Sequence, residues 1–279
     1  MQNILIPTDF SKNAVKAARY ALKVFGNKAN YTLLNTYEVP HSGATMLITI
    51  ADILEKDSLQ LLQEAKAGLA KDFPELEGKI EILAKMGAPD NVIEKLTDRD
   101  DYDMVVMGTQ GATGLKGALV GSVASKTMES VKCPVIAVPE SVEFKLPRKI
   151  LYAADDKCLQ EGAFPKELAN LAQEFDSEVM VLNVIPEGEA DHVGNSPENE
   201  REPISVFDNV KHSFHFVENK DVRYGIERFI QENQVDLLAM VTRRSDLISK
   251  LFGLSVTKQM MLDTSVPLVA FHNGTQDST

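Results

Sequence analysis

The sequence predicts an α/β fold that occurs twice: two tandem open parallel sheets of five strands each, with helices on both faces, in a Rossmann-like architecture. Two observations predict it. Short apolar runs alternate with segments of helical periodicity, and continuous apolar runs are typical of strands covered on both faces of a parallel sheet. The same runs also recur in the same order in both halves of the 279-residue chain.

The recurring runs divide the chain into two domains, which we predict at residues 1–143 and 144–279. The polar stretch 140–147 contains a proline after a strand and is the expected seam. The matching runs are residues 3–9 with 149–155, 31–36 with 178–184, 103–107 with 236–240, and 133–138 with 266–271.

Local signals define the elements of the first half. Ser11 is a good N-cap before apolar positions at helical spacing, and Gly26 is suited to end that helix. Pro89 is suited to open a later helix. The second half repeats the pattern with a shorter second-helix region, and we expect a mobile polar loop at residues 191–203. In the first half we expect strands at residues 3–9, 31–36, 80–84, 104–107 and 133–138, and helices at 11–26, 46–73, 89–96 and 123–131.

A split glycine motif is the most informative functional signal. Gly108 and Gly111 follow the buried strand 104–107, and nine residues later Gly121 and Ser122 precede a helix. In this strand–loop–helix context, backbone N–H groups and a helix N-terminus converge on phosphate oxygens. Glycine is needed where the backbone approaches a phosphate closely or takes a positive φ, and serine caps the helix or meets a phosphate. The alternative is a flexible loop with incidental glycines.

Composition excludes several classes of partner. The net charge of −12 argues against non-specific binding to nucleic acid and against an anionic membrane surface. No signal peptide and no apolar run long enough to span a bilayer is recognised. Cys133 and Cys158 are scattered thiols without metal-ligand spacing, and His212 and His215 lack a third ligand, so we expect no metal site in the protein itself. The expected location is the cytoplasm.

These residues together resemble the universal stress protein family. The most specific match is the Gly-x2-Gly-x9-Gly-Ser signature, and the segments Pro7 to Ser11 and Gly87 to Pro89 also match its ATP-binding members. The resemblance covers each half and implies a sheet of strand order 3-2-1-4-5, with ATP and Mg²⁺ as the cofactors. In that order the connections reverse between strands one and four, and ligands bind at such a switch point. Asp9 and Gly108 therefore face one crevice.

The resemblance also implies roles for individual residues in binding an adenine nucleotide. Asp9 would accept hydrogen bonds from the nucleotide, although a helix cap is an alternative role, and the backbone of Thr36 would read the adenine edge. Lys116 matches the family loosely and would add a cation. The implied set is Pro7, Thr8, Asp9 and Thr36 for adenine and ribose; Met107, Gly108 and Gly111 for ribose and the first phosphates; and Gly121, Ser122, Val123 and Ala124 for the distal phosphates.

The second half departs from this pattern. Val241, Arg244 and Leu254 stand where the glycines would be, whereas Asp155 still matches Asp9 and Ser255 still matches Ser122. Side chains at these positions occupy space where a nucleotide needs bare backbone. We therefore expect the second half not to bind nucleotide, and expect Asp155 to cap a helix.

The expected function is ATP binding in the first half, in the service of stress tolerance or nucleotide-dependent signalling. No positioned general base or nucleophile is visible, so a dedicated enzyme is not expected. The alternatives are a slow ATPase or phosphotransfer enzyme at the same site, and a nucleotide-independent interaction scaffold. Because an exposed apolar sheet edge is usually covered, we expect the fifth strands, residues 135–138 and 268–271, to pair as an intramolecular pseudo-dimer. A further homodimer is compatible with this arrangement.

Overall fold

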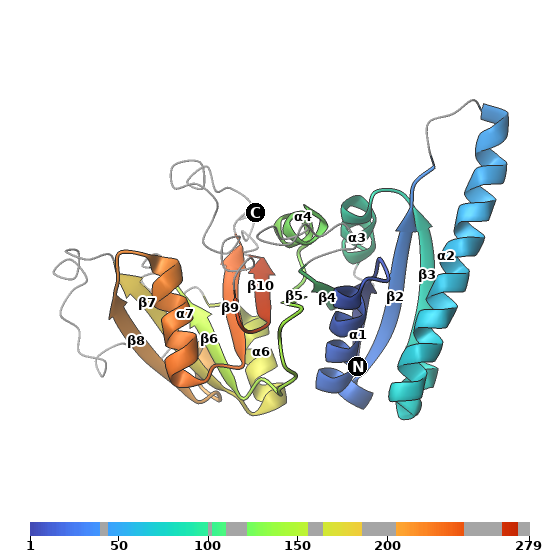
Figure 1. Ribbon diagram of the computed structural model, residues 1–279. Coiled ribbons are helices and arrows are strands. Elements are labelled where there is room, and N and C mark those ends of the chain that lie inside the picture. Colours follow the sequence, from blue (N-terminus) through green and yellow to red (C-terminus); the bar gives the residue numbers. More distant parts are fainter. Residues whose placement is uncertain are drawn as a thin grey trace. The chain divides into compact units, whose positions relative to one another are not determined.

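The structure is a computed structural model that describes residues 1–39, 44–99, 102–109, 122–155, 164–185, 205–242 and 264–272. The chain divides into two compact units, Met1–Ser141 and Val142–Thr279 (Figure 1). Each unit is an α/β domain built on a parallel sheet, which confirms the predicted fold class. The polar loop expected at residues 191–203 lies outside the described residues.

The described residues of the first unit form parallel strands in the order β3-β2-β1-β4-β5, the order that the family resemblance implies. The strands are continuous apolar runs at their centres, and Ile4, Leu5 and Ile6 of β1 are fully buried. The bounds are β1 Gln2–Pro7, β2 Ala29–Tyr37, β3 Ile80–Met86, β4 Met104–Gly108 and β5 Val135–Val138.

Among the described residues, the helices that connect these strands are α1 Lys12–Phe25, α2 Ala44–Asp72, α3 Pro89–Thr97 and α4 Ser122–Ser130. As predicted, Ser11 caps α1 by accepting a hydrogen bond from the Ala14 N–H, and Gly26 ends the helix with a φ of 51°. Helix α1 packs on β1, β4 and β5, and α2 packs on β2 and β3. Helices α3 and α4 pack against each other, and right-handed crossovers place them on the opposite face of the sheet.

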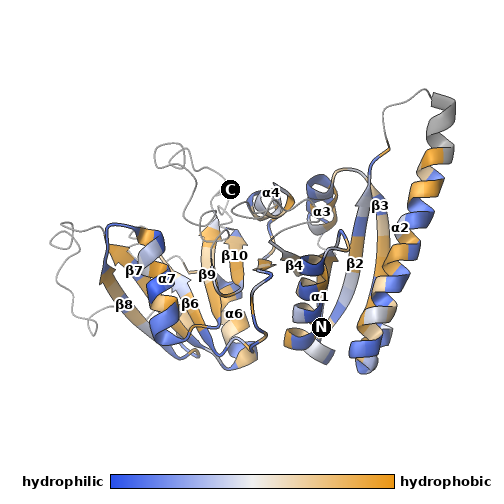
Figure 2. Cartoon of the chain, in the orientation of Figure 1, coloured by the Kyte–Doolittle hydropathy of each residue, from blue (hydrophilic) through white to orange (hydrophobic). Residues whose placement is uncertain are grey.

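The second unit repeats the topology, with strand order β8-β7-β6-β9-β10. Tyr152, Phe164 and Phe207 form an aromatic cluster in its core. The ring centroid of Phe164 lies 5.6 Å from that of Tyr152 and 5.2 Å from that of Phe207. Strands β9 and β10 are almost entirely apolar (Figure 2). The bounds are β6 Lys149–Ala153, α6 Lys166–Phe175, β7 Glu178–Ile185, β8 His212–Glu218, α7 Val222–Asn233, β9 Leu237–Thr242 and β10 Leu268–His272.

Candidate functional site

The ends of three strands bring the predicted nucleotide residues of the first unit to one edge of the sheet. Pro7 of β1 pairs with Leu34 of β2, so the same register continued places Asp9 level with Thr36. The Thr8 N–H donates to the Leu34 carbonyl at 2.8 Å, which shows that the pairing does continue. The pairing of β1 with β4 likewise places Thr8 level with Gly108. Asp9, Thr36 and Gly108 therefore share the carboxyl edge of the sheet at its switch point.

The turn after β1 is braced by its own side chains. The Thr8 hydroxyl accepts the Phe10 N–H at 3.0 Å, and the Asp9 Oδ1 accepts the Ser11 N–H at 3.0 Å. Phe10 has a φ of 63°, in the left-handed region that is uncommon for a phenylalanine. Asp9 thus takes part in organising the helix entry, the alternative role that its sequence position allows, and its side chain remains exposed at the sheet edge.

Two asparagines that the sequence analysis missed, the half-buried Asn35 and the buried Asn183, hold the strand ends in place. Asn35 Nδ2 donates to the Thr8 carbonyl at 2.7 Å, and the Ser58 hydroxyl on α2 donates to Asn35 Oδ1 at 2.7 Å. In the second unit, Asn183 Nδ2 donates to the Ala154 carbonyl at 3.1 Å. Both asparagines occupy the same place in the matching runs 31–36 and 178–184, so the repeat itself was the signal that could have found them.

The first glycine of the motif lies against helix α1. A Cβ atom added to Gly108 would be 2.5 Å from Asn13 Oδ1 and 2.8 Å from Asn13 Cγ. The Asn13 side chain is buried, and its Nδ2 donates to the Val138 carbonyl at 2.9 Å. Packing therefore requires a glycine at this position, in addition to any requirement that a ligand imposes.

Three of the predicted phosphate residues, Ser122, Val123 and Ala124, lie in the first turn of α4. Ser122 is exposed as the first residue of this helix, and Val123 is half-buried. Ala124 and Met107 are buried core residues, so only their backbone groups are available to a ligand. Gly111, Lys116 and Gly121 lie outside the described residues.

One ion pair links α4 to α3, and a second links Lys132, just after α4, to Asp98, the C-cap residue of α3. Lys126 Nζ lies 3.0 Å from Asp90 Oδ2, and Lys132 Nζ lies 2.9 Å from Asp98 Oδ1. The hydrogen bond from Lys126 lowers the pKa of the Asp90 carboxyl below its ordinary value. Both pairs are partly exposed, so each contributes little to stability, but together they constrain how α4 is set against α3.

The corresponding edge of the second unit carries apolar side chains. The register of β6 with β7, continued, places Asp155 level with Val184, where the first unit has Thr36. The register of β6 with β9 places Ala154 level with Val241, where the first unit has Gly108. Val184 also contacts α7 closely, because a Cβ added to Gly225 of that helix would lie 2.8 Å from Val184 Cγ1. Arg244, Leu254 and Ser255 lie outside the described residues.

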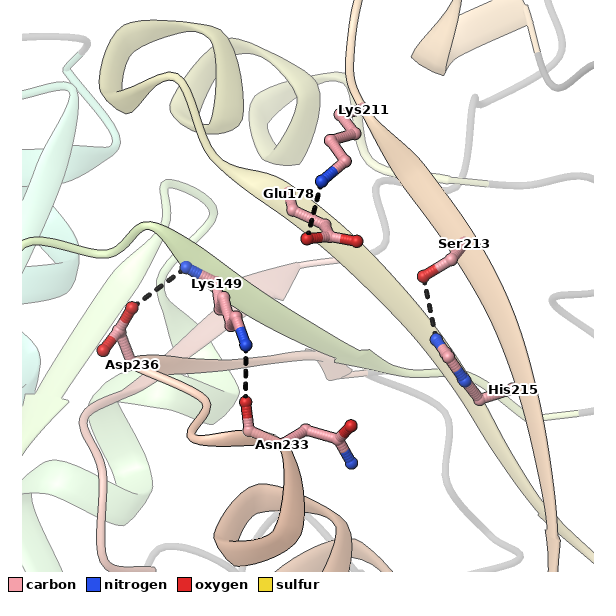
Figure 3. A network of polar contacts seen from close by, with 7 residues as sticks. All are labelled: Lys149, Glu178, Lys211, Ser213, His215, Asn233 and Asp236. Atoms are coloured by element: carbon pink, nitrogen blue, oxygen red, sulfur yellow. Dashed lines mark hydrogen bonds and ion pairs between the residues drawn. The ribbon is translucent and has the colours of Figure 1, made fainter.

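The amino edges of both sheets share a second feature that the sequence analysis missed. Asp103 Oδ2 accepts the Asn3 N–H at 2.7 Å, and Asp236 Oδ2 accepts the Lys149 N–H at 3.0 Å (Figure 3). In return, the Asp103 N–H donates to the Asn3 carbonyl and the Asp236 N–H to the Lys149 carbonyl, each at 2.9 Å. Each aspartate therefore joins the start of its unit's first strand to the start of the fourth.

A cavity of about 480 Å³ lies near this edge in the second unit, but its cations are engaged by the protein. Lys149 Nζ donates to the Asn233 carbonyl at 2.9 Å, and Lys211 Nζ pairs with Glu178 at 3.1 Å (Figure 3). Arg148 donates to the Phe175 carbonyl at 2.6 Å. The cavity thus offers an anion no uncommitted charge among these three side chains.

The histidines of β8 are unsuited to share a metal ion. His212 and His215 are separated by an odd number of positions along the strand, so their side chains point to opposite faces. His215 Nε2 is 2.8 Å from the Ser213 hydroxyl (Figure 3). Within the described ranges there is no group of three or more His, Cys, Asp or Glu side chains that could hold a metal, and no helix long and apolar enough to cross a membrane.

The fold, with the ends of β1, β2 and β4 at one edge of the first sheet, defines a tandem Rossmann-like α/β protein, and comparison with known proteins assigns its family. The model of the Universal stress protein family matches residues 1–139 and again residues 147–272. The chain therefore belongs to the universal stress protein family and contains two tandem copies of its domain.

Individual relatives agree with this assignment. A universal stress protein of Synechocystis is 26% identical over 306 aligned residues, which cover 97% of this chain and 100% of the relative. One from Methanocaldococcus jannaschii is 30% identical over 145 residues, covering 49% of this chain and 81% of the relative. The crystal structure of a universal stress protein from Archaeoglobus fulgidus has the same fold, with a TM-score of 0.69 at 17% identity, covering 97% of this chain and 96% of that one.

Proposed function

We propose that the first unit binds one ATP molecule, together with Mg²⁺, and that the chain acts in stress tolerance or nucleotide-dependent signalling. The observation that carries this proposal is the convergence of Asp9, Thr36 and Gly108 at the switch point of the first sheet. The proposed site uses the whole predicted set, including Gly111 and Gly121 from the sequence motif.

The chemistry at the ends of β1, β2 and β4 suits a nucleotide. An ionised Asp9 carboxylate accepts hydrogen bonds only, which fits the hydroxyl and amino donors of an adenosine. Thr36 is level with Asp9 on the adjacent strand, where its backbone is available to the base. The N-terminus of α4 at Ser122 supplies N–H groups and a positive dipole end for phosphate. Because the chain is acidic overall, Mg²⁺ bound to the triphosphate would reduce the repulsion between the phosphates and the protein's carboxylates.

The proposal assigns no nucleotide to the second unit. Its strand ends retain Asp155, but Val184 and Val241 stand level with it and with Ala154. These apolar side chains occupy the places of Thr36 and Gly108, and Val184 is packed under α7. A carboxylate without the neighbouring bare backbone offers one polar contact where the first unit offers several.

Binding rather than turnover is the proposed activity. The described residues of the first unit include no histidine to serve as a general base. Release of inorganic phosphate from bound ATP in a single-turnover experiment would instead favour the slow ATPase or phosphotransfer function.

A matched pair of variants in the full chain tests the proposal. We expect calorimetric titration of the wild type with ATP and Mg²⁺ to give about one site per chain. Asp9→Ala should weaken binding by at least tenfold, because hydrogen bonds to a charged group contribute about 1.5–3 kcal/mol. Asp155→Ala removes the equivalent strand-end aspartate and should leave the affinity unchanged. Two equivalent sites, or equal effects of the two substitutions, would contradict the assignment.

A further inference from the structure

Asn13 lies where three elements of the first unit meet. It is in the first turn of α1, and its side chain is only 3% exposed. Its Nδ2 donates to the carbonyl of Val138, the last residue of β5, at 2.9 Å. Val138 pairs with Gly108, the last residue of β4. A buried amide of α1 therefore reaches the point where the two strands end.

The Val138 carbonyl also receives the first residue after β4. The Thr109 N–H donates to it at 3.3 Å, and the Thr109 side chain is 5% exposed. Asn13 and Thr109 thus share one acceptor, and the direction in which the chain leaves β4 is set next to the asparagine. The glycine motif begins at this place in the sequence.

Gly108 and Asn13 fit each other as a pair. A Cβ on Gly108 would lie 2.5 Å from Asn13 Oδ1, 2.8 Å from its Cγ and 3.1 Å from its backbone carbonyl carbon. The first two distances are too short for any real Cβ contact, and a buried, hydrogen-bonded amide has little room to move away. The amide fills the volume that the missing side chain leaves.

We propose that Asn13 is a positioning residue for the start of the glycine motif: it fills the space beside Gly108, ties β4 and β5 to α1, and so orients the backbone of Gly108 and Thr109 toward a bound nucleotide. This inference rests on the proposed function. It also gives Gly108 two separable roles. One is packing against Asn13, and the other is the close approach of bare backbone to the ligand.

The first test compares ATP with adenosine on the full chain. Asn13→Ala should raise the dissociation constant for ATP at least tenfold and that for adenosine less than threefold, because adenosine lacks the phosphates and its adenine depends on the ends of β1 and β2. The control is Asn183→Ala in the second unit, which removes a similarly buried amide bonded to a strand-end carbonyl. It should leave the ratio of the two dissociation constants unchanged.

The second test is a double-mutant cycle on thermal stability without nucleotide. Gly108→Ala should lower Tm strongly in the wild-type background and much less in Asn13→Ala, because the two shortest contacts are then removed. The double variant should have a higher Tm than Gly108→Ala alone, but its affinity for ATP should stay as low as that of Asn13→Ala.

The outcomes separate this inference from the proposed function. Equal loss of Tm on Gly108→Ala in both backgrounds, or equal effects of Asn13→Ala on ATP and adenosine, would overturn the positioning role. If the wild type binds no ATP, the proposed function fails and the nucleotide role of Asn13 fails with it, whereas the stability cycle still decides whether the two residues are a packing pair.

Discussion

Cys133 should be unreactive, even though a thiol in a stress protein suggests a redox sensor. Partial burial, together with the nearby carboxylates of Asp103 and Asp98, raises the pKa of the Cys133 thiol from 9.0 to about 12. At pH 8 the thiolate fraction then falls from about one in ten to about one in ten thousand. Because the thiolate is the nucleophile, we expect alkylation at least a hundredfold slower than for a small free thiol.

The assay is iodoacetamide labelling at pH 8, followed by mass spectrometry of the peptide that contains Cys133. A Cys158→Ser background leaves one thiol to follow, and labelling in urea shows the rate of the exposed chain. The native rate should continue to rise up to about pH 11, since the thiol stays protonated until its raised pKa is approached. Labelling of the native protein as fast as in urea would refute this reasoning and make oxidation of Cys133 a candidate signal.

Three further predictions concern the ligand, pH and assembly. Gly121→Val should weaken ATP binding at least tenfold, about 1.4 kcal/mol, in calorimetry while Tm without nucleotide changes little; normal binding would exclude Gly121 as a phosphate contact. Because Lys126 lowers the folded-state pKa of Asp90 below 3.8, that pair should stabilise the fold at neutral pH and cease to do so as the pH falls through the lowered pKa. Asp90→Asn should therefore reduce the unfolding free energy by at most about 1 kcal/mol in urea titrations at pH 7, and the difference from wild type should shrink as the pH is lowered below 3.8. A fragment of residues 1–143 should self-associate through β5 in sedimentation experiments, and a strictly monomeric fragment at high concentration would argue against paired fifth strands.

The regular elements were largely predictable because their signals are local. Ser11 and Gly26 bound α1 as their capping chemistry predicts, and the apolar spacing of residues 46–73 anticipates α2, which runs over Ala44–Asp72. Pro89 opens α3 as expected. The third strand extends two residues beyond the predicted 80–84, to Met86, because its end is held by pairing with Tyr37 rather than by its own apolar residues.

The contacts that shape the candidate site were less predictable because they join distant positions. Asn13 bonds a carbonyl 125 residues away and Asp103 an N–H 100 residues away, and neither leaves a local pattern. Gly108 was expected to be a glycine on account of the ligand, whereas the structure adds a packing reason that only the position of α1 reveals. Asp103 and Asn35 do have counterparts in Asp236 and Asn183, so comparing the repeats position by position would have exposed both.

The reciprocal bonds between Asn3 and Asp103 have a consequence for how the first unit is made. The central strand β1 emerges first from the ribosome, yet its partner β4 follows about 100 residues later, as the register shows. Closing so long a loop costs conformational entropy and is slow. Until β4 is synthesised, β1 can pair only with β2. The centre of the first sheet is complete once β4 pairs with β1, and β1 to β5 all lie within Met1–Ser141. The first sheet can therefore form while the second unit is still being synthesised.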